Sequence, residues 1–129
     1  MDTAIFSVMV QLRPHLDLQS FTAGLADVRR EGGRLIGAFD GEACLGCAVF
    51  RPQFRLAYGR IVYVGDLVTD ETRRSSGVGK ALIAHIETEA ETLDAKLVIL
   101  DSGVQRERAH RFYFREGFSI TSFNFKKPL

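Results

Sequence analysis

The stretch Asp66-Leu-Val-Thr-Asp-Glu-Thr-Arg-Arg-Ser-Ser-Gly-Val-Gly-Lys80 lies between a strand-like and a helix-like segment. Arg60 to Thr69, which leads into this stretch and includes its first four residues, shows the alternation of a central strand. A helical stripe follows it, formed by Val78, Leu82, Ile86, Ala90 and Leu93. Glycines at a helix start let backbone N–H groups approach an anion, and the helix dipole favours the negative charge by about 0.3–1 kcal/mol. The stretch therefore predicts a turn that binds a phosphate group.

The spacing of its glycines distinguishes three phosphate-binding motifs. A nucleotide P-loop would need Gly at 74 and Ser or Thr at 81, but the chain has Arg74 and Ala81. A dinucleotide fingerprint would need a third small residue where the chain has Leu82. The pattern that remains is Arg74-x-x-Gly77-x-Gly79. A glycine-rich helix start beside surface arginines would explain the same residues without a ligand.

The chain before this stretch predicts two helices. Apolar residues at helical spacing predict the first over Asp2 to Leu12, and Pro14 ends the pattern. Asp17 is a suitable N-cap for the second, which Gly32-Gly33 ends.

A β-hairpin is expected next. Arg34 to Phe39 and Glu42 to Phe50 flank Asp40-Gly41, a pair suited to a two-residue turn. A looser segment from Pro52 to Tyr58 is expected to lead into the central strand.

After the glycine-rich stretch and its helix, three more elements are expected. Lys96 to Leu100 predicts a short buried strand, parallel to the central one because a helix connects them. Gln105 to Glu116 predicts a helix that Gly117 closes. Phe118 to Phe125 predicts a strand with a bulge or bend, since its apolar phase slips.

The composition is that of an ordinary globular domain. The 129 residues are 46% apolar and 26% charged, so we expect one domain over residues 1–129. Nucleic-acid binding would call for a net basic charge and base-stacking aromatics on an exposed sheet, and the net charge of only +1 argues against it. We find no signal peptide and no apolar run that would span a membrane, which predicts a cytoplasmic protein with reduced thiols. Cys44 and Cys47 are expected to be small buried side chains on opposite faces of a strand, and no metal site is expected.

A second motif follows about 30 residues after the first: Ala109-His-Arg-Phe-Tyr113, then Gly117-Phe118. On a helix, Ala109 and Tyr113 share one face, so a ligand could come close where a phenol can donate a proton. A tyrosine packed in the core would explain the residue equally well.

Taken together, the two motifs resemble the GNAT superfamily of acetyl-CoA-dependent N-acetyltransferases. The resemblance covers nearly the whole chain, Asp2 to Phe125. It implies an α/β (α+β) fold with a mixed, mostly antiparallel sheet and about four helices. The two parallel central strands, Arg60 to Thr69 and Lys96 to Leu100, would splay apart to admit acetyl-CoA as the cosubstrate. The family's first strand is missing, because this chain is helical almost from its start.

The resemblance also assigns cofactor-binding residues. The main chain of Leu67, Val68 and Thr69 would bind the pantetheine arm and the thioester carbonyl. The diphosphate would be held by Arg73, Arg74, Ser75, Ser76, Gly77, Val78, Gly79 and Lys80. Ala109 would give the cofactor room beside its helix. Many members carry Asn where this chain has Arg106, which could meet the cofactor's phosphates instead.

The reaction implied is direct attack of a primary amine on the thioester in a ternary complex. It needs an oriented thioester, an acid for the departing thiolate and a base for the ammonium proton. Tyr113 occupies the position of the usual acid. Asp66 is our candidate base; an aspartate that orients substrate or pairs with an arginine is the alternative. Asp101 and Ser102, at the carboxyl end of a parallel strand, are candidates for substrate binding.

The partners follow from the same expectations. The acceptor would be a small-molecule or peptide amine, which the sequence does not identify further. Without the family's first strand, Arg34 to Phe39 would be an uncovered edge, so we expect a homodimer that covers either this edge or the Phe-rich C-terminal strand. A non-catalytic module of the same fold that binds acyl-CoA or a partner protein is the alternative function.

Overall fold

Two helices begin the chain, as their apolar spacing predicts. The computed structural model describes residues 2–73 and 76–129. Helix α1 spans Asp2–Leu12 and helix α2 spans Leu18–Arg30. The Asp17 carboxylate accepts a bond from the Ser20 N–H at 2.7 Å, and the Ser20 hydroxyl accepts one from the Asp17 N–H at 3.0 Å. This reciprocal pair is a capping box, so the predicted N-cap is confirmed.

The predicted hairpin is confirmed with a turn one residue later than expected. Strand β1 spans Arg34–Asp40 and strand β2 spans Ala43–Arg55. Asp40 pairs with Ala43, so the two-residue loop is Gly41-Glu42, and Gly41 has φ +61°. A glycine at the first loop position meets the positive φ of a type II′ turn.

The looser segment expected over Pro52 to Tyr58 was wrong. Strand β2 continues to Arg55 in register with β3, Gly59–Thr69, which leaves residues 56–58 as the turn. β1 begins opposite Phe50, so past that point β2 is paired with β3 on one side. A proline is tolerated there because the open side of the strand needs no N–H donor.

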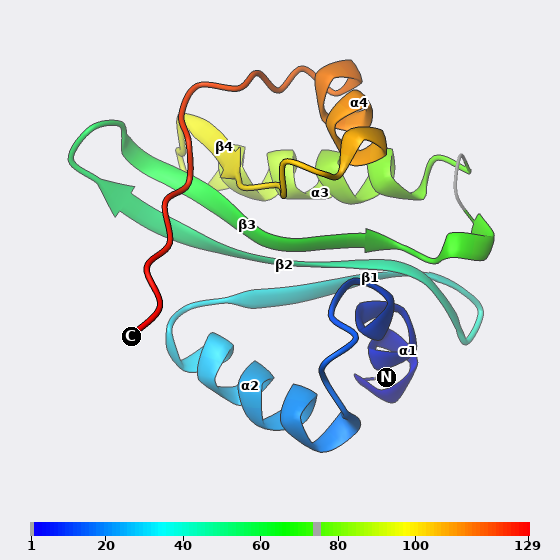
Figure 1. The fold of residues 1–129 in the computed structure, drawn as a ribbon. Coiled ribbons are helices and arrows are strands. Elements are labelled where there is room, and N and C mark those ends of the chain that lie inside the picture. The colour runs from blue at the N-terminus through cyan, green and yellow to red at the C-terminus, as the bar shows by residue number, and fades with distance from the viewer. Residues whose placement is uncertain (1, 74–75) are drawn as a thin grey trace. The chain divides into compact units, whose positions relative to one another are not determined.

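The sheet has the order β1-β2-β3-β4 and is mixed, as expected. β1 with β2 and β2 with β3 are antiparallel. Strand β4, Leu97–Leu100, begins beside the start of β3, where the Lys96 N–H donates to the Arg60 carbonyl at 2.9 Å. Since β4 has 4 residues and β3 has 11, the carboxyl end of β3 runs on past β4 (Figure 1).

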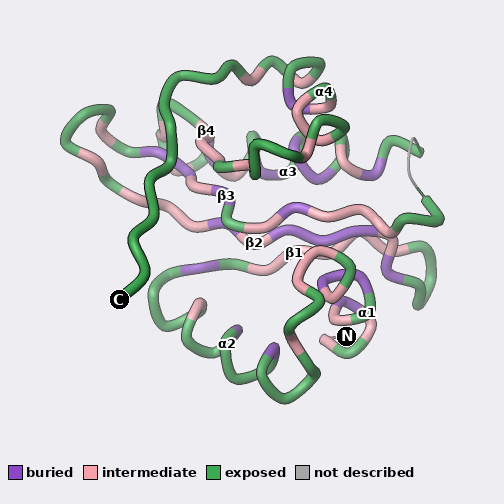
Figure 2. Tube along the Cα trace, in the orientation of Figure 1, coloured by how far each residue is buried: buried purple, intermediate pink, exposed green. Residues whose placement is uncertain are grey.

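Two expectations about the C-terminal part were wrong. β4 is partly exposed rather than buried, with Leu97 at 43%, and it is the last strand of the described sheet rather than a central one. Phe118 to Phe125 forms no strand within the described ranges, and Phe123 and Phe125 are 80% and 92% exposed (Figure 2). A β-prone composition makes a strand only where another strand supplies backbone partners.

Helices cover both faces of the sheet. α1 and α2 lie on one face, and α3, Val78–Thr92, lies on the other (Figure 1). A 3₁₀ turn, η1 at Glu71–Arg73, precedes α3. α3 comes close to β2 at Gly46, where an added Cβ would lie 2.7 Å from Val78 Cγ1 and 2.9 Å from the Val68 carbonyl oxygen. Gly46 therefore lets the start of α3 meet the end of β3.

A bulge changes which face the cysteines occupy. Ala38 pairs with Gly46 and Phe39 with Cys44, so Leu45 is the extra residue in β2. The shift puts Cys44 on the same face as Cys47, toward α1 and α2, which corrects the expectation of opposite faces. Both are free thiols and both are buried, as predicted.

The residues group into two compact units, one reaching to Ile99 and one from Leu100 to Leu129. The second contains helix α4, Glu107–Arg115, within the predicted range. Gly117 ends it at φ +92°. The Phe118 N–H donates to the Tyr113 carbonyl at 3.0 Å and the Gly117 N–H to the Phe114 carbonyl at 3.2 Å, a Schellman motif.

Candidate functional site

A second bulge shapes the carboxyl end of β3. Val49 pairs with Asp66 and Phe50 with Val64, so Gly65 is the extra residue. The predicted unbroken alternation through this strand was therefore wrong at Gly65. Asp66 and Val68 still share a face, the one toward α1 and α2, whereas Val64 faces α3. Along the rest of the strand, Leu67 is buried, and Val68 and Thr69 are half-buried.

The turn after β3 is fixed at Asp70. Its N–H donates to the Leu45 carbonyl at 2.8 Å, and its own carbonyl accepts from the Arg73 N–H at 2.8 Å. Its carboxylate accepts from the Thr72 N–H at 3.2 Å and from Gln11 Nε2 at 3.3 Å. The Thr72 bond and then the Gln11 bond hold the pKa of Asp70 below its usual value. Ser76 Oγ closes the turn by donating to the Arg73 carbonyl. The predicted phosphate ligands Arg74 and Ser75 lie outside the described residues.

The start of α3 has the features of an anion site. Gly77 is the N-cap, with φ +86° and no side-chain cap, and an added Cβ would meet nothing within 4 Å. The first backbone bond of the helix joins the Ala81 N–H to the Gly77 carbonyl at 3.0 Å. The earlier N–H groups have no partner within the helix. Arg73 and Lys80, both exposed, lie on either side of this start. The arrangement suits a diphosphate that backbone donors and flanking cations bind together.

The end of α1 holds the end of β3 through two side chains. Arg13 Nε donates to Asp66 Oδ1 at 2.7 Å, and Arg13 Nη2 donates to the Gly65 carbonyl at 3.2 Å. Gln11 Oε1 accepts from the Glu71 N–H at 2.9 Å while its Nε2 donates to Asp70. Sequence reasoning missed both residues, because 53 positions separate Arg13 from Asp66 and neither belongs to a motif. The arginine partner for Asp66 was one of the alternatives it left open.

Tyr113 is a buried residue of α4 in the second unit, 8% exposed. The Phe112 and Phe118 rings lie edge-on to its ring, at centroid distances of 5.5 and 5.7 Å. Burial raises the pKa of the phenol, and the charge and hydrogen bond of Arg106 oppose that rise. A tyrosine in this setting remains protonated at neutral pH. Ala109, on the same helix, is half-buried.

The two substrate candidates, Asp101 and Ser102, directly follow β4 and belong to the second unit, as Tyr113 does. Asp101 is exposed, and its Oδ2 accepts from Asn124 Nδ2 at 3.5 Å. Ser102 Oγ is a buried hydroxyl without a hydrogen-bond partner among the described residues. A buried hydroxyl normally finds a partner, so Ser102 retains the capacity to bond a ligand.

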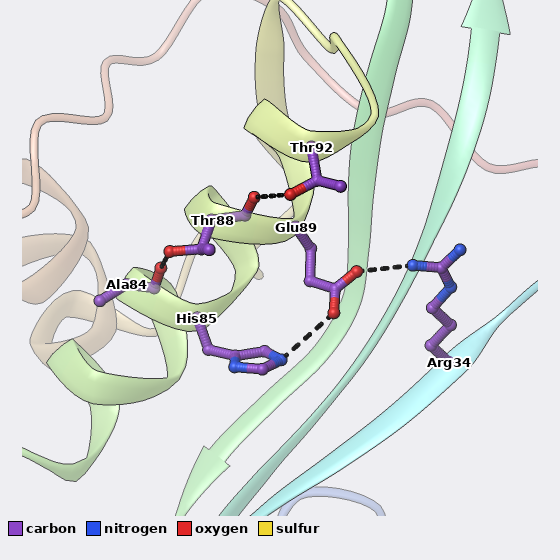
Figure 3. A network of polar contacts seen from close by, with 6 residues as sticks. All are labelled: Arg34, Ala84, His85, Thr88, Glu89 and Thr92. Atoms are coloured by element: carbon purple, nitrogen blue, oxygen red, sulfur yellow. Dashed lines mark hydrogen bonds and ion pairs between the residues drawn. The ribbon is translucent and has the colours of Figure 1, made fainter.

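A polar network holds α3 to the edge strand, away from its N-terminal end. Arg34 Nη1 lies 2.7 Å from Glu89 Oε2, and His85 Nε2 lies 3.5 Å from Glu89 Oε1 (Figure 3). Beside it is a hollow of about 260 Å³, lined by Ile36, Gly37, Ala38, Ala81, Leu82 and His85. None of these lining residues is a predicted site residue.

Among residues 2–73 and 76–129, no three His, Cys, Asp or Glu side chains gather where they could hold a metal ion. None of the helices in those ranges is both long and apolar enough to cross a membrane.

Comparisons with known proteins extend these observations. The model of the acetyltransferase (GNAT) family matches residues 5–118. The N-acetyltransferase YhdJ of Bacillus subtilis is 33% identical over 126 residues, which is 96% of this chain and 89% of the relative. The aminoalkylphosphonate N-acetyltransferase of Salmonella typhimurium is 32% identical over 121 residues, 92% of this chain and 78% of the relative.

Solved structures share the fold. An aminoglycoside N-acetyltransferase, AAC(6')-Iy in complex with CoA, superposes with a TM-score of 0.89 at 14% identity, covering 99% of this chain and 88% of that one. A Trypanosoma brucei acetyltransferase superposes with a TM-score of 0.76 at 23% identity, covering 100% of this chain and 95% of that one. The family match and the two N-acetyltransferase relatives establish that this chain is an acyltransferase and belongs to the acetyltransferase (GNAT) family.

Proposed function

We propose that this protein transfers an acetyl group from acetyl-CoA to a primary amine by direct attack in a ternary complex. The observation that carries the proposal is the junction of β3 and α3. There the left-handed Gly77 opens α3 without a side-chain cap, after the short turn that follows the half-buried end of β3. Gly46 allows these two segments to approach each other.

The residues present fit acetyl-CoA, which supplies the activated thioester when bound. We assign the diphosphate to Arg73, Arg74, Ser75, Ser76, Gly77, Val78, Gly79 and Lys80. The main chain of Leu67, Val68 and Thr69 would bind the pantetheine arm and orient the thioester. Arg106 and Ala109 complete the proposed cofactor site, on the resemblance to the family. The match of one family model to residues 5–118 supports a single acetyltransferase domain made by both units.

The proposed acid is Tyr113. Its role is to give a proton to the thiolate that leaves when the amine nitrogen bonds to the thioester carbon. The raised pKa supports the assignment, because the phenol still carries its proton at neutral pH.

The proposed base is Asp66, and its role is to take the proton that the substrate's ammonium must lose before its nitrogen can attack the thioester. Its side chain is 23% exposed and is held by Arg13, so it is both oriented and reachable. Asp101 and Ser102 are proposed to bind the acceptor.

The location of the protein, its partners and its oligomeric state are also proposals. A cytoplasmic enzyme that binds neither nucleic acid nor membrane is expected from the sequence. A homodimer is supported by the exposed Phe123 and Phe125 and by β1, which is an edge of the described sheet.

A calorimetric titration with acetyl-CoA tests the function, followed by a thiol-release assay over a panel of primary amines. Arg74→Ala should weaken acetyl-CoA binding at least tenfold. Arg30→Ala, a change of an exposed arginine on α2, should leave binding unchanged. Micromolar binding together with thiol release that depends on the amine supports the enzyme. Binding without release for any amine would favour a non-catalytic acyl-CoA-binding module.

A further inference from the structure

The ion pair of Arg13 and Asp66 has features that a purely structural contact does not need. The two charged groups belong to the end of α1 and the end of β3, and their contact of 2.7 Å lies on the face of the sheet toward α1 and α2. The side chains are 42% and 23% exposed, so solvent reaches both partners.

Both groups have bonding capacity beyond this contact. Arg13 uses Nε for Asp66 and Nη2 for the Gly65 carbonyl, and a guanidinium has five N–H groups. Asp66 accepts the Arg13 bond at Oδ1, and a carboxylate has about four acceptor positions. A positive and a negative group are thus presented side by side, each able to take one more ligand atom of opposite charge.

The pair also lies next to the proposed reaction centre. Asp66 directly precedes Leu67, where the main chain assigned to the thioester begins. An amine that attacks this thioester must bring its nitrogen close to the end of β3. An ammonium group at Asp66 would therefore place any second group of a short substrate near Arg13.

We propose that Arg13 and Asp66 together select a short primary amine that carries an anionic group. The ammonium binds at Asp66 and the phosphonate or carboxylate binds to Arg13. This inference rests on the proposed function and specifies its substrate class. The zwitterion matches the pair charge for charge, and the planar guanidinium suits a two-oxygen anion. An amine without an anionic group leaves Arg13 without a substrate partner. A diamine places a second positive charge next to Arg13.

The Salmonella typhimurium relative is consistent with this class, since its name specifies an aminoalkylphosphonate, which is an amine joined to such an anion. The argument for this chain rests on Arg13 and Asp66 themselves.

The test compares four amines of similar length: 2-aminoethylphosphonate, β-alanine, propylamine and 1,3-diaminopropane. Thiol release gives kcat and KM for each amine, and calorimetry gives the affinity of 2-aminoethylphosphonate for protein saturated with CoA. We expect kcat/KM for the better anionic amine to exceed that for propylamine at least tenfold. The two anionic amines show whether phosphonate or carboxylate is the preferred group.

Variants of Arg13 separate recognition from support of Asp66. Because Arg13 also holds Asp66, Arg13→Ala should lower kcat/KM for every amine, but at least tenfold more for the anionic amines than for propylamine, with the extra loss mainly in KM. Arg13→Lys should restore part of the loss, because it keeps the charge without the planar fork. Arg29→Ala is the matched control, since Arg29 also pairs with an aspartate, Asp2, at the surface of the same two helices.

Two outcomes would overturn the inference while the proposed function stands. One is equal use of propylamine and the anionic amines by the natural protein. The other is an equal loss for all amines in Arg13→Ala, which would make Arg13 a positioning residue for Asp66. Failure of acetyl-CoA to bind, with no release for any amine, would instead overturn the proposed function and this inference together.

Discussion

The two units of this chain offer their proposed chemistry in different ways. In the unit up to Ile99, the proposed cofactor site consists mainly of backbone, with its donors at the start of α3 and the end of β3. In the unit from Leu100 on, the proposed donation of a proton depends on one side chain, the buried phenol of Tyr113. A backbone site is sensitive to glycines and to packing, whereas a side-chain site is sensitive to the removal of one functional group. Substitutions of the two kinds should therefore affect different measurements.

The largest effect is expected at Tyr113. Tyr113→Phe removes the proposed proton donor and keeps the ring that packs between Phe112 and Phe118. Loss of a general acid typically costs 10²–10⁴-fold, so kcat should fall by roughly 100-fold or more, with acetyl-CoA affinity within about twofold. Steady-state kinetics and calorimetry on the same preparation measure both. An unchanged kcat would show that Tyr113 is a core tyrosine and not the acid.

The next effect concerns the approach of α3 to the sheet. Gly46→Ala places a methyl group 2.7 Å from Val78 Cγ1 and 2.9 Å from a backbone carbonyl, so the start of α3 must shift. Overpacking of this kind costs about 1–3 kcal/mol of unfolding free energy and should also weaken acetyl-CoA binding at least tenfold. Urea unfolding and calorimetry report the two effects.

Gly65→Ala is the matched control for Gly46→Ala. Its added Cβ would meet its nearest atoms at 3.9 and 4.0 Å, an ordinary contact distance. Normal cofactor affinity in Gly46→Ala would argue against a site at the β3–α3 junction.

A smaller effect is expected at Gly77, where a control of similar backbone geometry exists. Gly77 has φ +86° and Gly32 has φ +87°, and an added Cβ at either position meets nothing within 4 Å. Each change to alanine should cost about 1–2 kcal/mol of stability, because both impose left-handed strain. Only Gly77→Ala should also weaken acetyl-CoA binding, by about three- to tenfold. Equal cofactor affinities in the two variants would contradict the assignment of the diphosphate to this turn.

The smallest effect is a dependence on pH at Asp70. Its folded-state pKa is lowered, so its stabilising bonds are fully present above the ordinary value of 3.8 and are lost as the pH falls through the lower folded value. The stability gap between the natural protein and Asp70→Ala should be constant from pH 5 to 8 and close below 3.8. Urea midpoints across this range measure it. A gap that persisted at the lowest pH would mean that the carboxylate charge contributes nothing.

Local chemistry explains what could be predicted from the sequence. Asp17 caps its helix through a residue three positions away, and Gly117 closes α4 through residues within five positions. The glycine-opened start of α3, to which we assign the diphosphate, could be predicted for the same reason, since Gly77 and the first turn of the helix are adjacent in the chain. Interactions of this range depend on short sequence patterns and little on the rest of the fold.

Only the tertiary structure determined which faces and partners are used. The bulge at Leu45 puts Cys44 and Cys47 on one face, and the bulge at Gly65 reverses the alternation along β3, because register depends on the neighbouring strand. The Arg13–Asp66 pair joins residues 53 positions apart, and no local pattern encodes such a contact. β2 extends past Pro52 because β3 pairs with it. Phe118 to Phe125 forms no strand because none of the described strands pairs with it. Sequence by itself determined the helices, their caps and the glycine that opens α3, and long-range backbone pairing decided the rest.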